Sequence, residues 1–143
     1  RFMINLYYRH FSRFNMLKTP QQKWKEAIVT YRKKCQKILA LSNSIRYAGI
    51  INEYGRTLTG MVRPNTIPLW SAEEVKNEFF IISTLMTLRK LYAQKVGALD
   101  FLLLSHTQVT ILAFQRKNIT YYVSIDVKTK NIENLVSKIK KIL

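Results

Sequence analysis

The chain has 143 residues, of which 48% are hydrophobic and 12% aromatic, and this composition excludes a disordered protein and suits one folded, soluble domain. It carries 24 Lys and Arg against 8 Asp and Glu, a net charge of +16, which leaves nucleic acid and anionic membrane surfaces open as partners. The single cysteine, Cys35, excludes an internal disulfide and indicates a reducing, cytoplasmic setting, and the sequence has no apolar run of the roughly 18 residues that a transmembrane segment needs.

Residues 1–20 mix aromatic side chains with arginine and lack the apolar core of a signal peptide. The chain begins with Arg1 where a native start would be Met, and Met16 offers an alternative start. The aromatic residues between the arginines could stack on nucleic-acid bases or anchor the segment to a membrane surface. We expect residues 1–20 to be a basic and aromatic leader, disordered or not native, and residues 21–143 to form a single domain.

A helical pattern begins after Pro20, because apolar residues recur at spacings of three and four from Trp24 through Cys35 to Leu39. The other side of this helix is cationic, and residues 1–40 contain ten Lys and Arg but only one acidic residue, Glu26. Such a run is usually a solvated face, but a stripe of one sign also suits contact with a phosphate backbone. The candidate nucleic-acid contacts are Lys23, Lys25, Arg32, Lys33, Lys34 and Lys37.

The stretch "RYAGIINEYGRTLTGMVRP" at 46–64 contains glycines and arginines, and so could be a phosphate-binding loop or a β-hairpin. A P-loop requires Lys and then Ser or Thr after its last glycine, but Met61 and Val62 follow Gly60. A tight hairpin turn needs a residue that tolerates positive φ, which Gly55 provides. We therefore predict two short strands joined by a turn, with alternating side chains from Ile45, and no phosphate site.

A second helix is predicted from "SAEE" at 71–74, where Ser71 and Glu74 have the spacing of a capping box, to about Val96, where Gly97 ends it. The helix is apolar on two sides, so two surfaces must cover it. Its wider apolar stripe consists of Ile81, Leu85, Leu88, Tyr92 and Val96.

We assign this wider stripe to the sheet and the narrower stripe to a second copy of the chain, because polar residues border the narrower stripe as they border an interface. The bordering residues are Lys76, Ser83, Arg89 and Lys90. The predicted dimer-interface residues are Val75, Phe79, Ile82 and Met86.

Three segments rich in β-branched and aromatic residues follow, "LDFLLLS" from 99, "VTILAFQ" from 109 and "ITYYVSID" from 119. The connections between them are short, which requires antiparallel neighbours. A last amphipathic helix begins near Asn131. The order αββαβββα predicts an α+β fold, a five-stranded antiparallel sheet with helices on both faces.

No catalytic or metal-binding site is expected. Cys35 lies on the apolar stripe of the first helix, where a buried hydrophobe is more common than a nucleophile. His10 and His106 have no second ligand nearby in the sequence. Asp100 and Asp126 lie near strand ends, and their spacing does not force them together. We expect no cofactor.

This element order, with the glycine hairpin "GIINEYGRTLTG" and a doubly apolar central helix, resembles the Roadblock/dynein light chain family, which has a profilin-like sandwich fold. The resemblance covers residues 21–143. At the level of individual residues, "RYAGIINEYGRTLTGMVRP" and "NEFFIISTLMTLRK" are similar to an uncharacterised protein family of ammonia-oxidising archaea (Nitrososphaeria), which implies no particular activity.

Roadblock proteins generally form homodimers through the central helix and the adjoining third strand, and many are platforms or regulators for small GTPases. The resemblance implies that these roles fall on residues 71–96 and 99–105. We therefore expect a non-enzymatic, homodimeric scaffold or regulatory module that binds itself and a protein partner, such as a small GTPase. The alternative is a basic nucleic-acid-binding protein that uses the first helix.

Overall fold

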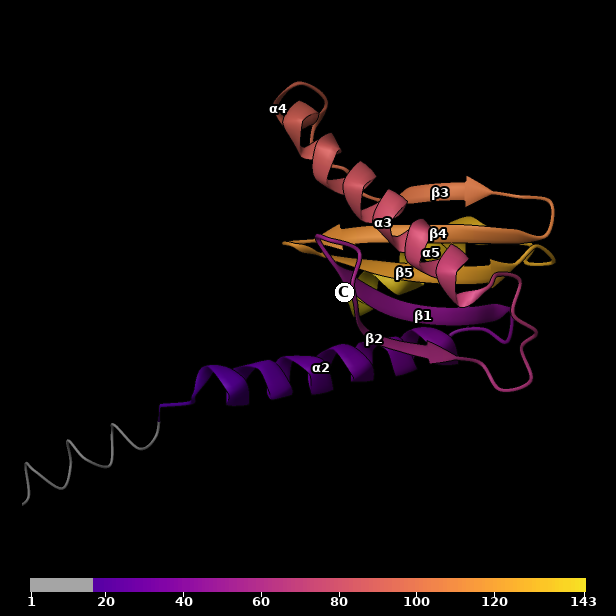
Figure 1. Ribbon diagram of the computed structural model, residues 1–143. Coiled ribbons are helices and arrows are strands. Elements are labelled where there is room, and N and C mark those ends of the chain that lie inside the picture. Colours follow the sequence, from indigo (N-terminus) through magenta and orange to yellow (C-terminus); the bar gives the residue numbers. More distant parts are fainter. Residues whose placement is uncertain (1–16) are drawn as a thin grey trace, which may run out of the picture. The chain divides into compact units, whose positions relative to one another are not determined.

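Five antiparallel strands form the centre of the structure, a computed structural model that describes residues 17–143 (Figure 1). The elements, in chain order, are α2 (Pro20–Ala40), β1 (Ile45–Asn52), β2 (Thr57–Val62), α3 (Ala72–Arg89), the 3-10 turn η1 (Lys90–Tyr92), α4 (Ala93–Val96), β3 (Leu102–Ser105), β4 (Val109–Arg116), β5 (Ile119–Asp126) and α5 (Ile132–Ile142). The strand order in the sheet is β2-β1-β5-β4-β3. The predicted α+β class and the five-stranded antiparallel sheet are confirmed.

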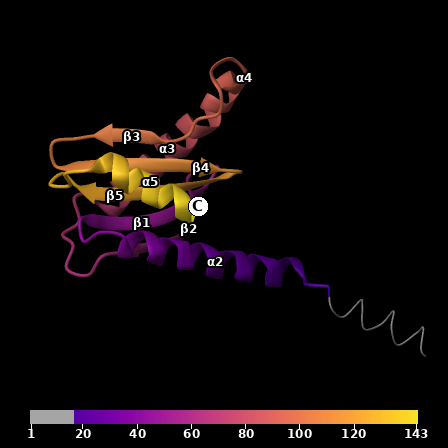
Figure 2. The ribbon, with the colours of Figure 1, turned by 180° about the vertical axis from the view of Figure 1, so that it is seen from behind.

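Helices cover both faces of this sheet, so its central strands are buried on two sides. α3 lies on one face and α5 on the other, as the views from front and back show (Figures 1 and 2). The α5 side holds a core that includes Cys35 and Ile38 from the second half of α2, Leu135 and Ile139 from α5, and Phe114 from β4. A second, smaller core lies under α3.

The structure divides into two units, one that ends at Thr30 and one of residues 31–143. The division between the two units lies inside α2. In the described part of the first unit, the hydroxyl of Thr19 accepts a hydrogen bond from the Gln22 amide at 3.1 Å, and Oε1 of Gln22 accepts one from the Thr19 amide at 3.0 Å. This reciprocal cap, with Pro20 in the first helical position, begins α2. The expectation for a leader falls mostly on residues 1–16, outside the described residues.

The hairpin between β1 and β2 is confirmed, and Gly55 adopts the positive φ (84°) that its turn requires. Oδ1 of Asn52 accepts hydrogen bonds from the amides of Tyr54 (2.9 Å) and Arg56 (3.0 Å) and so closes the turn. A β-carbon at Gly55 would also lie 2.8 Å from the backbone nitrogen of Phe80 in α3. The glycine therefore allows both the turn and its close approach to the helix.

A register shift between Ile45 and Tyr47 changes the predicted alternation of β1. Ile45 was expected on the same face as Tyr47 and Ile51, but it packs in the core on the α5 side, whereas Ile51 packs under α3. An extra residue in one strand reverses the sides on which the following residues point. The alternation is correct only beyond this irregularity.

The capping box that begins the second helix is confirmed. The Ser71 hydroxyl accepts from the Glu74 amide at 3.2 Å, and Oε1 of Glu74 accepts from the Ser71 amide at 3.1 Å. The predicted single helix is interrupted, however, because α3 ends at Arg89 and the short η1 and α4 follow. Gly97, with a φ of 87°, ends the helical segment as predicted.

Candidate functional site

The helix α3 is apolar on two sides, as its sequence predicts, but the assignment of the two sides to the sheet and to a partner is wrong. Three residues of α3 that were expected at a dimer interface are instead buried between the helix and the sheet: Phe79, Ile82 and Met86. They pack with Ile111 and Tyr122 of the sheet. Ile82 is 1% exposed and Met86 is fully buried.

The fourth predicted interface residue, Val75, is half-buried and lines a cavity beside the same sheet face. Ser83, expected on a polar rim, is also buried, because its hydroxyl donates a hydrogen bond to the Phe80 carbonyl at 3.0 Å within the helix. A hydroxyl that is satisfied by its own helix can lie in a core, so it does not mark the edge of a contact. Ser83 was therefore a misleading marker of the interface.

The wider stripe faces away from the sheet and leaves a continuous apolar surface on this segment. Ile81 is 58% exposed and Leu88 is 52% exposed, and no charged side chain lies between them on this side of the helix. The exposed apolar residues of α3, η1 and α4 are Phe80, Ile81, Leu85, Leu88, Leu91, Tyr92 and Val96. We call this set the outer face of α3.

Strand β3 adjoins this region and forms one edge of the sheet, since among residues 17–143 it pairs with β4 alone. Leu102 and Leu104 of β3 pack against the core under α3, and Leu103 is partly exposed on the opposite side. Its sequence, LLLS, contains no charged residue or proline that would prevent another strand from pairing with it. In the part of the chain that the structure describes, no strand pairs with the outer edge of β3.

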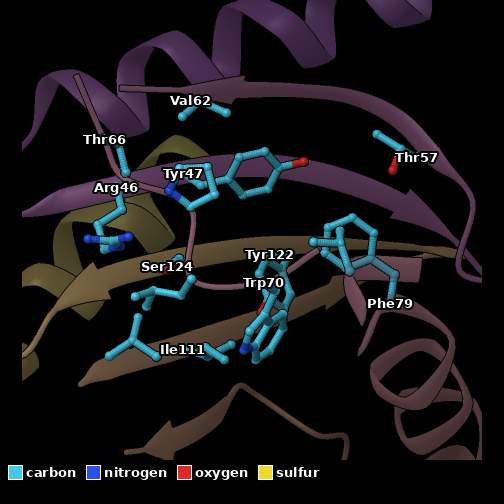
Figure 3. A pocket seen from close by; sticks show the side chains of 14 residues that line it. Arg46, Tyr47, Thr57, Val62, Thr66, Trp70, Phe79, Ile111, Tyr122 and Ser124 are labelled. Atoms are coloured by element: carbon cyan, nitrogen blue, oxygen red, sulfur yellow. The ribbon is translucent and has the colours of Figure 1, made fainter. Parts of the chain in front are cut away.

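A cavity of about 330 Å³ lies on the face of the sheet that α3 covers, next to the first turns of α3 and the loop at 63–71 (Figure 3). Its walls come from all of these elements and from β1, β2, β4 and β5. Aromatic rings form much of the wall: Phe79 and Tyr122 meet edge to face with centroids 4.9 Å apart, and Tyr47 lies 6.3 Å from Phe79 and 6.2 Å from Tyr122. No motif in the sequence indicates this cavity, because its lining residues come from separate elements of the fold.

Two of the three arginines in the stretch 46–64, Arg46 and Arg63, have different roles. Arg63 is part-buried, and its guanidinium donates to the carbonyls of Ile45 (2.6 Å), Ser42 (2.8 Å) and Leu39. It therefore joins the end of α2, the following turn and the start of β1. Arg46 lines the cavity and donates to the carbonyl of Ile67 at 2.7 Å. The structure thus places the two guanidinium groups on separate partners.

Five of the six cationic side chains of α2 are exposed, as a solvated or phosphate-binding face requires, but the sixth is not. Lys34 is half-buried, and its ammonium group lies 5.9 Å from the centre of the Tyr121 ring. Contact of a cation with an aromatic face is favourable, so Lys34 is not part of a free surface. The exposed candidates are Lys23 and Lys25 in the first unit and Arg32, Lys33 and Lys37 in the second.

The thiol of Cys35 is buried in the core on the α5 side, as expected, and burial raises its pKa to about 11. A protonated, inaccessible thiol is a poor nucleophile. The carboxylate of Asp100 forms an ion pair with the Lys140 ammonium group at 2.6 Å and lies 3.9 Å from the Arg116 guanidinium. The carboxylate of Asp126 accepts a hydrogen bond from the Lys128 amide in the turn that follows β5. These two carboxylates therefore do not form a pair with each other.

Within residues 17–143, no group of three or more His, Cys, Asp and Glu side chains is placed to hold a metal ion. His106 lies in the turn between β3 and β4, and His10 is outside the described residues. In the same part of the chain, no helix has the length and apolar character to cross a membrane.

No family model matches the chain, and no curated protein matches it in sequence. Solved structures do match its fold. Myxococcus xanthus MglB aligns with a TM-score of 0.62 at 12% identity, over 80% of this chain and 83% of that chain. A Roadblock/LC7 domain from Streptomyces avermitilis aligns with a TM-score of 0.59 at 7% identity, over 77% and 88% of the two chains.

A further structure, described as MglB with a tetrameric arrangement, aligns with a TM-score of 0.59 at 12% identity, over 80% of this chain and 93% of that chain. None of these comparisons tests the resemblance to a family of ammonia-oxidising archaea. The sequence identities are low, and these proteins share with this chain the arrangement of sheet and helices. The chain therefore has the Roadblock/LC7 fold.

Proposed function

We propose that the protein is a non-enzymatic, homodimeric scaffold or regulatory module, in which the outer face of α3 and the edge strand β3 form the contact between two copies. The observation that carries this proposal is the exposure of seven large apolar side chains on one helical segment. A contiguous apolar patch on a folded surface is typical of an interaction site.

Burial of this face would supply much of the association energy. Each large apolar side chain removed from water contributes roughly 1.5–3 kcal/mol, and a two-fold axis would bring the same stripe from each copy into contact. The centre of the stripe, at Ile81 and Leu88, is uncharged. Two copies with a net charge of +16 each can therefore approach at this centre without like charges between them, whereas the Arg89 guanidinium lies 5.3 Å from the Tyr92 ring and so borders the contact.

Strand β3 would extend this contact. Two β3 strands that pair across the two-fold axis would hydrogen-bond their free backbone groups and continue the sheet from one copy to the other. The tetrameric arrangement named for an MglB of the same fold supports self-association of such a module. The resemblance to Roadblock proteins supports a protein partner, and a small GTPase is the class that we propose.

The test is the mass of the protein in solution. Light scattering after gel filtration should give twice 16.9 kDa for the wild type. Replacing Ile81→Asp and Leu88→Asp together should give a folded monomer, because a carboxylate cannot be desolvated in an apolar contact without a large cost. Ile67→Asp is the control, since Ile67 is 78% exposed on the loop that precedes α3 and is not part of its outer face, and it should leave the dimer intact. A wild-type mass of 16.9 kDa at high protein concentration contradicts the proposal.

A nucleic-acid partner is a second candidate for the cationic residues of α2. In residues 17–143, the three ion pairs do not involve Arg32, Lys33 or Lys37, so these exposed charges are free to meet phosphates. Replacing all three with Glu should then abolish retention on DNA or RNA, and binding by the wild type should weaken steeply with salt. Retention of the triple variant at low salt, or no retention of the wild type, excludes this site. The apolar dimer contact should respond little to salt.

A further inference from the structure

The cavity beside α3 has the size and the lining of a small-molecule site. Its volume of about 330 Å³ falls within the range of roughly 300–1,000 Å³ that is usual for ligand pockets. Most of its lining is apolar or aromatic, including Trp70, Phe79, Val109 and Ile111. Pockets of this composition bind the apolar body of a ligand and orient it with a few polar groups.

A pair of glycines maintains the wall of the cavity at Tyr47. Gly49 of β1 and Gly60 of β2 are paired across the two strands, and a β-carbon at either one would lie 2.2 Å from the Tyr47 hydroxyl oxygen. The ring therefore lies against bare backbone instead of extending across the cavity. Glycine inside a strand weakens the strand and often marks a place where another group must come close. Here it makes room for the ring.

The irregularity in β1 brings a cation to the same cavity. Successive residues of a regular strand point to opposite faces, but the register shifts between Ile45 and Tyr47, and both Arg46 and Tyr47 line the cavity. Bulges of this kind often redirect a side chain next to a functional site. In Figure 3, Arg46 lies at one end of the view and Phe79 at the other.

Arg46 has donors to spare. Among residues 17–143, its guanidinium group makes one hydrogen bond, from Nη2 to the carbonyl of Ile67, and no ion pair. A guanidinium group binds a carboxylate through two parallel hydrogen bonds. Of the described residues, Arg46 is the single charged one that lines the cavity, so the cavity suits one negative charge and not a nucleotide or polyphosphate.

We propose that this cavity binds a small monocarboxylate with an apolar body, its carboxylate on Arg46 and its body against Tyr47, Trp70, Phe79 and Tyr122. Two classes of compound have this combination of one carboxylate and an apolar body, medium-chain fatty acids and aryl-substituted acetic acids. The site uses the sheet-facing side of α3 and not its outer face, so it does not depend on the proposed dimer.

Fluorescence of Trp70 provides a direct test, because the chain has only two tryptophans and Trp24→Phe leaves Trp70 as the single probe. This variant is titrated with decanoate and with 1-naphthaleneacetate, and separately with decanol and with acetate. We expect a saturable change with one or both of the apolar acids, the pair that distinguishes an aliphatic from an aromatic ligand. We expect much weaker binding of decanol, which lacks the charge, and of acetate, which lacks the apolar body.

Two further substitutions in this background locate the site. Arg46→Gln should weaken binding of the acids by about tenfold or more, the effect of losing a charged hydrogen-bond partner. Arg56→Gln removes the same charge from the exposed hairpin turn and should leave binding unchanged. Val75→Phe should fill the cavity, abolish the fluorescence change and raise the melting temperature of the free protein.

The proposal is overturned if neither acid gives a saturable signal, if decanol binds as tightly as decanoate, or if Arg46→Gln and Arg56→Gln bind the acids equally well. Calorimetric titration of the wild-type protein with the same four compounds gives an independent measure. These readouts do not report on oligomeric mass, so failure here leaves the proposed dimer untouched.

Discussion

The hydroxyl of Tyr122 donates a 2.8 Å hydrogen bond to Oε2 of Glu78, and this bond joins β5 in the middle of the sheet to α3 above it. Both residues are at least half-buried. Burial raises the pKa of Tyr122, and the nearby Glu78 carboxylate raises it further, because both oppose a negative charge on the phenol. The bond therefore holds α3 over the sheet with Tyr122 as a neutral donor.

Removal of this donor should destabilise the fold. Tyr122→Phe leaves the part-buried carboxylate of Glu78 without its partner, and we expect a loss of about 1–2 kcal/mol in the free energy of unfolding, measured by urea denaturation. Tyr54→Phe is the control, because Tyr54 is exposed on the hairpin and should tolerate the change. Equal effects of the two substitutions would show that the bond to Glu78 contributes nothing.

Stability should fall at alkaline pH because of buried tyrosines and the thiol. Burial raises the pKa of Tyr47 and of Tyr121 from 10.0 to about 12 and that of Cys35 from 9.0 to about 11. These groups stay protonated in the folded protein at a pH where they ionise in the unfolded chain. The unfolded state then binds fewer protons, so a rise in pH stabilises it relative to the folded state. Their contribution is fully present below pH 9 and is lost as the pH rises from about 9 to about 12. Denaturation midpoints measured across this range should decrease, and less so in Tyr47→Phe.

Two adjacent isoleucines of α3 test the corrected assignment of its faces. Ile82→Ala removes a side chain that is 1% exposed, and we expect it to lower the free energy of unfolding by about 2–5 kcal/mol. Ile81→Ala should barely change the stability of the monomer, since its side chain lies outside the core, and should weaken the dimer. Denaturation under dilute, monomeric conditions measures the first effect and the concentration dependence of the mass measures the second. The reverse result would restore the original assignment.

The contact of Gly49 and Gly60 with the Tyr47 ring predicts that the effect of a substitution at Gly60 on stability depends on the residue at position 47. Gly60→Ala should destabilise the wild type, because the new methyl group collides with the Tyr47 ring. In a Tyr47→Ala background the same substitution should be neutral or stabilising by about 0.5–1 kcal/mol, since Ala is favoured over Gly inside a strand. A double-mutant cycle by urea denaturation gives the coupling energy. A coupling near zero would mean that the ring does not require the glycine.

Local chemistry in the sequence was sufficient for the element order and for several ends of elements. Ser71 and Glu74 form the predicted capping box, Gly55 adopts the predicted positive φ, and Cys35 is buried as its place on an apolar stripe implies. Each of these depends on residues a few positions apart, whose geometry is the same in any fold. Short connections between strands then required antiparallel pairing.

Tertiary structure decided what each surface meets. Periodicity showed that α3 has two apolar sides, but only its placement over the sheet determined that Ile82 is buried and Ile81 is exposed. The cavity likewise depends on a register shift in β1 and on the pairing of Gly49 with Gly60, which bring Arg46 and Tyr47 beside residues distant in the chain. The physical reason is the same in both cases: a periodic pattern specifies which side chains share a face, whereas the packing of other elements determines what covers that face.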